Sequence, residues 1–284
     1  MTIHPKAHIG LVSLRVTDLE RSLAYYQDSI GLRLLNREEN EAWLGTTDTP
    51  FLYLQGGALS PAPRGHSGLY HFAILLPSRP ELARAIRRLS ASETPLGGAS
   101  DHLVSEALYL SDPDGNGIEI YRDRPRNEWQ YSSDSVRMDS IQLDFDRIMA
   151  ETPSELRLDE PAPPETIVGH IHLHVSDLAA AGRFYQDVLG FEDQARDYPN
   201  ILAGFVSAGG YHHHIGYNTW AGTNIPPAPE TAAGLNWYEI VLPDEEAREA
   251  VVEKLAAAGI ETEVRERGIF LRDPSQNGIY LTLE

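Results

Sequence analysis

A small set of histidines and acidic residues has types and surroundings that suit a metal ion. The chain has 11 histidines, 42 acidic residues and no cysteine, so imidazoles and carboxylates are its available strong ligands. Three residues stand out: His71 in YHFAILLP, Glu119 in GIEIY and His170 in GHIHLHV. Two imidazoles and one carboxylate on one face bind a divalent first-row metal such as iron and leave coordination positions open.

Each of these residues alone has a simpler explanation. A lone histidine in an apolar strand, such as His71, is more often buried with a hydrogen-bond partner. His170 alternates with His172 and His174, so all three could face solvent from one side of a strand. Glu119 is harder to explain in this way, because burying a carboxylate is unfavourable unless it is paired or bound to a metal.

An internal repeat relates these residues to one another. The segment LVSLRVTDLERSLAYYQDSIGL, residues 11–32, matches HIHLHVSDLAAAGRFYQDVLGF, which begins at residue 170. GLYHFAILLP from residue 68 matches GLNWYEIVLP from residue 234, and DPDGNGIEIY from residue 112 matches DPSQNGIYLT from residue 273. The two halves of the chain are therefore copies, and the recurrence of ligand types at repeated positions favours a shared metal site.

Each half divides again into two modules. In the first, alternating residues predict a strand at 11–16, and Asp18 caps a helix that extends to Ser29 and ends at Gly31. Short strands are expected at 41–44 and 51–54. The second module has a predicted strand at 70–76, a helix at 80–89 and a closing strand at 118–121. The predicted order is βαβββ, four times, which makes an α+β fold.

The repeat also predicts the domain organisation. Modules 1 and 2 make a first domain over residues 1–125, and modules 3 and 4 make a second domain over residues 167–284. Residues 126–166 join the two halves, and this linker contains PAPP, many acidic residues and a helix expected around 140–150.

The metal candidates fall unequally among the modules. The position five residues before the Val or Leu that closes the first strand holds, in module order, Leu11, His71, His170 and Trp237. On the last strand the sequence aligns the stretch near Leu54 with Glu119, His214 and Tyr280. Modules 2 and 3 therefore carry all the ligand types. We expect these two modules to lie against each other and share the site, with modules 1 and 4 as a non-catalytic support.

Composition excludes several partners. The formal net charge of −19 repels phosphate backbones and anionic lipids, so we expect no nucleic-acid or membrane partner. The N-terminus has no signal-peptide pattern, and no apolar run approaches the roughly 18 residues of a membrane span. These features predict a soluble, cytoplasmic protein, and four modules in one chain allow either a monomer or a homodimer.

Several strings together resemble a known family. The segments that begin at Val16 and Val175, with the endings DPDGNGIEIY and DPSQNGIYLT, look like the vicinal oxygen chelate superfamily. This superfamily includes glyoxalase I, extradiol dioxygenases, and fosfomycin and bleomycin resistance proteins. HFAILLP, GHIHLHVSDL and SAGGYHHHIGYNTWAG look more narrowly like four-module catechol 2,3-dioxygenases. The resemblance covers nearly all of the chain except the linker, and it implies two half-barrel, cup-shaped sheets.

The resemblance also implies roles for individual residues. Metal ligands would be His71, Glu119 and His170, holding Fe(II) or alternatively Mn(II). Catalytic residues would be His214, Tyr109 and His102, of which His102 has a longer spacing to Tyr109 than the family pattern. There is one departure, because larger extradiol enzymes draw their ligands from modules 3 and 4. Here the ligand types lie in modules 2 and 3.

The expected function is cleavage of a catechol ring beside its two hydroxyl groups, with O2 as co-substrate. Two alternatives keep the fold. A fourth protein ligand such as His214 would favour a glyoxalase-like isomerase or lyase with Ni, Zn or Mn. A binding or resistance protein would hold a small molecule without turnover, although such proteins usually lack metal ligands. Phe72, Tyr217 and Trp220 are candidates for walls around a substrate ring and equally for the core.

Overall fold

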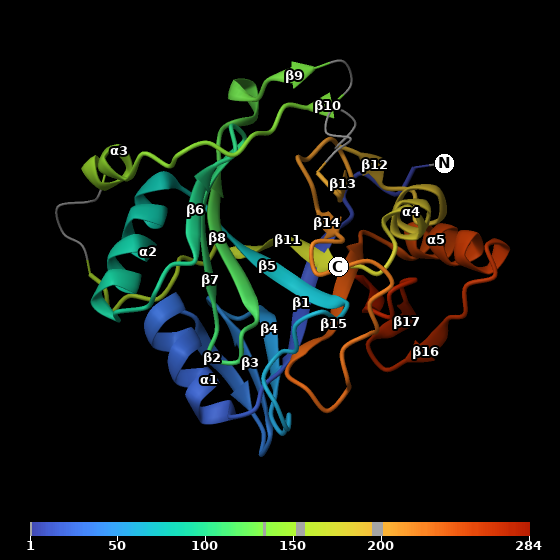
Figure 1. Ribbon diagram of the computed structural model, residues 1–284, viewed down its shortest axis with the longest axis horizontal. Coiled ribbons are helices and arrows are strands. Elements are labelled where there is room, and N and C mark those ends of the chain that lie inside the picture. Colours follow the sequence, from blue (N-terminus) through green and yellow to red (C-terminus); the bar gives the residue numbers. More distant parts are fainter. Residues whose placement is uncertain (1, 133–134, 152–156, 195–200) are drawn as a thin grey trace.

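The computed structural model describes residues 2–132, 135–151, 157–194 and 201–284. These residues form two eight-stranded mixed sheets and a small two-stranded ribbon (Figure 1). Helices α1 and α2 lie on one side of the strands, and α4 and α5 lie on the other (Figure 1). Among the described residues, none of the helices has the length and apolar character needed to cross a membrane.

All four modules have the predicted order of elements. Module 1 contains β1 (His8–Arg15), α1 (Leu19–Tyr25) with its π-helical continuation η1 (Tyr26–Ile30), β2 (Arg33–Arg37), β3 (Glu41–Gly45) and β4 (Pro50–Gln55). Module 2 contains β5 (Gly68–Leu76), α2 (Arg79–Ala91), β6 (Gly98–Asp101), β7 (Ser105–Ser111) and β8 (Gly117–Asp123).

The second half repeats the same elements. Module 3 contains β11 (Ile167–His174), α4 (Leu178–Gly182) with its π-helical continuation η3 (Arg183–Val188), β12 (Glu192–Asp193), β13 (Ala203–Ser207) and β14 (Ile215–Asn218). Module 4 contains β15 (Gly234–Leu242), α5 (Glu245–Ala257), β16 (Glu263–Arg265), β17 (Gly268–Arg272) and β18 (Gly278–Leu283). The predicted α+β fold of four βαβββ modules in two cup-shaped sheets is confirmed.

Each sheet combines one module from each half of the chain. One sheet, here the module 1/4 sheet, has the strand order β16-β17-β18-β15-β1-β4-β3-β2. The other, the module 2/3 sheet, has the order β12-β13-β14-β11-β5-β8-β7-β6. In both sheets the first strands of the two modules pair antiparallel at the centre, and each first strand runs parallel to the last strand of its own module. Modules 2 and 3 therefore lie against each other, as the sequence predicts.

The helices begin and end where local chemistry predicts. Asp18 caps α1, because its carboxylate accepts a hydrogen bond from the backbone N–H of Arg21 at 3.0 Å. Gly31 ends the following π-helical turn with φ 88°, a left-handed conformation that glycine adopts readily. The buried Tyr26 donates a hydrogen bond to the turn carboxylate of Asp112 at 3.0 Å, and this contact ties module 1 to module 2.

The linker is longer and more structured than a simple connection. It holds the 3-10 turn η2 (Arg126–Glu128), the ribbon β9 (Tyr131–Ser132) and β10 (Ser135–Val136), and helix α3 (Phe145–Ala150). The helix begins after residue 144 and not around 140, because Ile141 forms a β-bridge with Asp101 at the edge of the module 2/3 sheet. The linker therefore packs beside the module that carries two of the three predicted metal ligands.

Candidate metal centre

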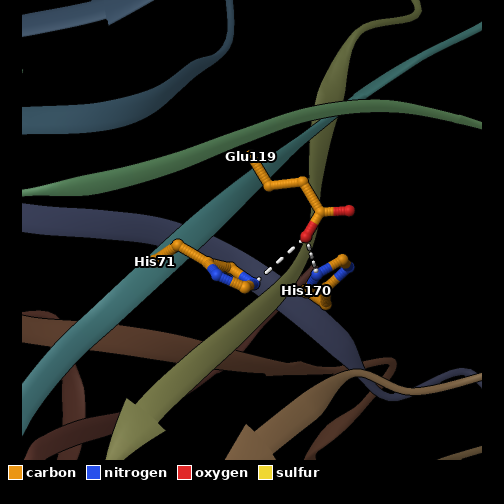
Figure 2. A group of neighbouring side chains, drawn as sticks. All are labelled: His71, Glu119 and His170. Atoms are coloured by element: carbon orange, nitrogen blue, oxygen red, sulfur yellow. Dashed lines mark hydrogen bonds and ion pairs between the residues drawn. The ribbon is translucent and has the colours of Figure 1, made fainter. Parts of the chain in front are cut away.

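Three central strands bring the predicted metal ligands together. Strands β5 and β11 pair antiparallel, so that His170 lies opposite Ala73, and β8 places Glu119 beside Ala73 on its other edge. His71 lies two residues before Ala73 on β5, so its side chain leaves the same face of the sheet. Figure 2 shows the three side chains converging, with the carboxylate of Glu119 between the two imidazole rings.

The distances fit one small cation. Nε2 of His71 and Nε2 of His170 lie 3.1 Å and 3.2 Å from the same carboxylate oxygen, Oε2 of Glu119. One candidate ligand atom from each residue lies within 4.8 Å of the others, and all three side chains are buried. Although Nε2 of His71 lies near this oxygen, it is buried and makes no hydrogen bond of acceptable geometry with any described residue. A divalent metal would give this nitrogen the partner that a buried polar atom requires.

The charge states also suit a cation. Burial lowers the pKa of His170 to about 4 despite the opposing effect of Glu119, so the ring is neutral near pH 7. Burial alone would raise the pKa of Glu119, but the neighbouring His170 and His71 hold it well below its usual range. A neutral imidazole and an ionised carboxylate are the forms that bind a metal.

A cavity of about 550 Å³ opens beside this cluster. His71 and Glu119 line it, together with the predicted residues His102 and Tyr109. Further walls come from the linker and from module 3, including Met138, Ser140, Ile201, Phe205, His213 and Trp220. Two of the three metal candidates, His71 and Glu119, therefore lie at the wall of a space large enough for a small aromatic molecule.

Tyr109 and His102 form a fixed pair at this cavity. Nε2 of His102 lies 2.6 Å from the hydroxyl of Tyr109, and Nδ1 lies 2.8 Å from the backbone oxygen of Asp139. A carbonyl oxygen can only accept, so Nδ1–H donates to Asp139 and the bare Nε2 accepts from the Tyr109 hydroxyl in neutral His102. The longer spacing seen in the sequence therefore does not separate the two side chains.

The module comparison that singled out His214 is wrong in register. The residue after His71 pairs with Ile118 on β8, and the residue after His170 pairs with Ile215 on β14. Glu119 follows Ile118 and Gly216 follows Ile215, so Gly216 is the counterpart of Glu119 in module 3. His214 is not among the residues that line the cavity. Its Nδ1 instead accepts a hydrogen bond from the backbone N–H of Ala208 at 3.1 Å.

Gly216 leaves the fourth position of the cluster without a side chain. A Cβ atom built on Gly216 would lie 2.8 Å from Cγ and 2.9 Å from Nδ1 of His172, so the imidazole of His172 fills the space. Nε2 of His172 accepts a hydrogen bond from Asn218 at 2.9 Å. The two paired modules thus supply three candidate ligand side chains and one glycine at the four equivalent positions.

The sequence did not single out His212 and His213 from their neighbour. Both line the cavity, and the ring centroid of His213 lies 4.1 Å from that of His170. The run of three histidines indicated the right segment, but all three precede β14, and only the cavity lining shows that His212 and His213 face the site. The three residues expected either around a substrate ring or in the core have different positions. Phe72 and Tyr217 are core residues, whereas Trp220 is 48% exposed and lines the cavity.

Comparison with known proteins agrees with this architecture. The model of the glyoxalase/bleomycin resistance protein/dioxygenase superfamily matches residues 8–120 and 167–281, which are the two repeated halves without the linker.

The chain belongs to this superfamily.

Within the superfamily, the chain is 45% identical over 285 residues to the catechol-2,3-dioxygenase of Bacillus subtilis strain 168, covering 99% of this chain and 98% of that protein. Two solved structures share the fold. Glyoxalase I from Zea mays has a TM-score of 0.58 at 16% identity, covering 97% of this chain and 92% of that one. A protein from Bacillus subtilis subsp. subtilis strain 168 has a TM-score of 0.68 at 14% identity, covering 100% and 86%. The resemblance seen in the sequence is confirmed.

Proposed function

We propose that this chain is an extradiol ring-cleaving dioxygenase of the catechol 2,3-dioxygenase type, with Fe(II) held by His71, Glu119 and His170. The observation that carries the proposal is the cluster of these three residues, together with Gly216 at the fourth equivalent position of the two modules, where no side chain is present. The relative from Bacillus subtilis, at 45% identity over almost the whole chain, supports the same activity. Mn(II) is the alternative metal, because it accepts the same ligands.

The number of ligands favours this reaction over an isomerase. A ring-cleaving site must leave room on the metal for two substrate oxygens and for O2, and three protein ligands on one face allow this. Fe(II) bound there would hold the diol and O2 together and pass electrons between them. A fourth protein side chain would close one of these positions, but the glycine at residue 216 contributes none. We therefore place the chain with the dioxygenases and not with glyoxalases.

The chain's own residues would orient the diol and handle its protons. Tyr109 and His102 lie at the cavity wall as a hydrogen-bonded pair, and they fix one face of the bound substrate. His213, which replaces His214 in this role, lies at the cavity beside His170 and accepts the proton of one hydroxyl group.

The cavity also favours one kind of substituent on the ring. Among the described residues that line it, there is no lysine or arginine, whereas Ile201, Phe205 and Trp220 offer apolar surface. A neutral, apolar substituent would pack against these side chains, but a carboxylate would find no cation to pair with. We propose catechol and apolar catechols as the preferred substrates, within the breakdown of aromatic compounds in the cytoplasm.

The test is oxygen consumption. The chain is purified without oxygen, loaded with Fe(II), and followed for O2 uptake and for the yellow ring-cleavage product after catechol is added. We expect one O2 consumed per catechol, with loss of both signals in His71→Ala. The matched control is Trp237→His, which places an imidazole at the same module position of the other sheet and should leave the reaction in place. Bound metal without O2 uptake would overturn the proposal, and turnover of a hemithioacetal would then favour the glyoxalase alternative.

His213 and His214 give a second, sharper comparison. We expect His213→Phe to keep the metal and lose most turnover, because the proton acceptor at the cavity is gone. His214→Gln should keep both, because its side chain faces Ala208 and the amide oxygen can still accept that hydrogen bond. Loss of turnover in the His214 variant alone would return the role to the residue first chosen from the sequence.

A further inference from the structure

A chain of hydrogen bonds leads from the end of β8 to the cavity wall. The carboxylate of Asp123, the last residue of β8, lies 3.0 Å from Nε2 of His212. Nδ1 of His212 in turn lies 2.8 Å from Nδ1 of His213. The His212 ring is buried and the side chain of Asp123 is 25% exposed, so the chain starts near solvent and ends at the site.

The donors and acceptors of this chain fix where each proton sits. A carboxylate only accepts, so Nε2 of His212 carries the proton that it donates to Asp123. Neutral His212 then has a bare Nδ1, which must accept from Nδ1–H of His213. Neutral His213 with its proton on Nδ1 has a bare Nε2. Among the described residues, the hydrogen bond of the His213 ring is made at Nδ1, and the His213 side chain lines the cavity.

We propose that Asp123 is a positioning residue that acts through His212 to keep the proton of His213 on Nδ1 and its Nε2 bare toward the cavity. The bare nitrogen is then the hydrogen-bond acceptor for a substrate hydroxyl. This deepens the proposed function and rests on it for the identity of the substrate. The arrangement of the protons is a property of the chain itself and can be measured without turnover.

A second contact of Asp123 makes one substitution decisive. The hydroxyl of Tyr211 donates to Oδ2 of Asp123 at 2.9 Å, while Oδ1 serves His212. The hydroxyl of Tyr211 accepts from the buried hydroxyl of Tyr121 at 2.7 Å, so its own proton goes to residue 123. In Asp123→Asn the amide oxygen keeps this bond from Tyr211, and the amide NH2 then faces His212. An NH2 group can only donate, so His212 must move its proton to Nδ1, and His213 must then carry its proton on Nε2. The acceptor that faced the cavity becomes a donor.

The experiment reads the imidazole nitrogens directly. Nitrogen-15 NMR of the full chain, metal-free and again with Zn(II) added, separates protonated from bare ring nitrogens. The His213 signals are identified by their absence in His213→Gln. We expect a bare Nε2 in the wild-type chain and a protonated Nε2 in Asp123→Asn. A protonated Nε2 in the wild-type chain, or no change in the variant, would overturn the proposal.

Steady-state kinetics with catechol then separates positioning from folding. We expect Asp123→Asn to lower kcat ~10- to 100-fold with little change in KM or in Fe(II) content, as for other supporting partners of a site. Tyr211→Phe is the matched control, since it removes the other hydrogen bond of Asp123 and leaves the proton order intact. An equal loss in both variants would show a purely structural role. If the wild-type chain cleaves no catechol, the proposed function fails while the NMR result still stands.

Discussion

The two sheets share one backbone plan and fill its central positions with opposite chemistry. In the module 2/3 sheet, the four equivalent positions hold His71, His170, Glu119 and Gly216. In the module 1/4 sheet, the same positions hold Trp237, Leu11, Tyr280 and Tyr53. The latter four belong to one buried cluster with Phe270. The difference shows that the module supplies the geometry, while a few side chains decide between an aromatic core and a candidate metal site.

A hollow remains in both sheets. The space beside the aromatic cluster is about 640 Å³, and the space beside the metal candidates is about 550 Å³. In the first, the rings of Tyr53 and Trp237 stack at 5.8 Å, and those of Trp237 and Tyr280 meet edge to face at 5.0 Å. Such contacts stabilise the fold, whereas a buried carboxylate and two imidazoles without a metal destabilise it. The module 1/4 sheet therefore serves as a support sheet, because it stabilises the chain that carries the candidate site.

The largest expected effect comes from removing a ligand. Glu119→Ala should abolish retention of Fe(II) and all ring cleavage, because two buried imidazoles alone cannot hold and neutralise the cation. Metal content after gel filtration and O2 uptake measure this. Tyr280→Phe, at the equivalent position of the support sheet, is the control and should retain both. Full metal content in the Glu119 variant would break the proposed difference between the sheets.

The support sheet should respond in stability and not in chemistry. Trp237→Ala removes a buried indole from the aromatic cluster, and we expect a loss of about 3–5 kcal/mol in the free energy of unfolding. Urea denaturation of the metal-free chain measures it. His71→Ala, its counterpart in the other sheet, should lose less, because it also removes a buried nitrogen without a partner. A larger loss for His71→Ala would contradict this reasoning.

The glycine at the fourth position gives a more selective test. In Gly216→Ala the new Cβ meets the ring of His172 at 2.8 Å, so this side chain at the cavity wall must shift. We expect kcat/KM for catechol to fall by up to ~100-fold, as for small displacements at a reacting centre, with the metal retained. Gly97→Ala is the control, because its Cβ would meet only the backbone carbonyl of Tyr109, with the oxygen at 3.5 Å. Loss of metal in Gly216→Ala would contradict this expectation, because it would mean that residue 216 affects metal binding itself.

The smallest effect concerns acid stability. Burial lowers the pKa of His214 from 6.5 to about 3, so the unfolded chain binds this proton before the folded chain does. The contribution of this group to the free energy of unfolding is therefore present above pH 6.5 and is lost as the pH falls toward 3. At pH 5.5 the loss is about 1.4 kcal/mol. His214→Gln cannot titrate, so its unfolding free energy should fall less between pH 6.5 and 5. Parallel curves for both proteins would contradict the buried, neutral state.

The sequence predicted the modules and the three ligand candidates because each lies in a repeated motif with a clear period. His71 and His170 occupy the same position of matched strands, and Glu119 closes a DPDGNGIEIY ending whose copy is also present. Strand pairing alone then brings them together. The pairing of modules 2 and 3 followed from the same residues, since the modules that hold ligands must meet.

Other parts of the site depend on contacts that no local pattern encodes. The segment YHHHIGYN has no break between loop and strand, so the sequence could not show that β14 begins only at Ile215. The carbonyl of Asp139 fixes His102 from 37 residues away, through a linker without periodicity. For the same reason the helix predicted from about 140 begins after Asp144, once Ile141 has paired with the sheet edge.

The crossed pairing of the modules sets the order in which the chain can be built. The first half emerges from the ribosome with β1 and β5, and each of these strands finds its central partner only in the second half, as β15 and β11. Until then both strands expose an unpaired edge, which is a template for aggregation. The two halves expressed as separate chains would each lack both sheet centres, and only their reassociation would restore them. The crossed pairing thus makes folding depend on contacts between the two halves, while it leaves one sheet to carry the candidate site and the other to stabilise the fold.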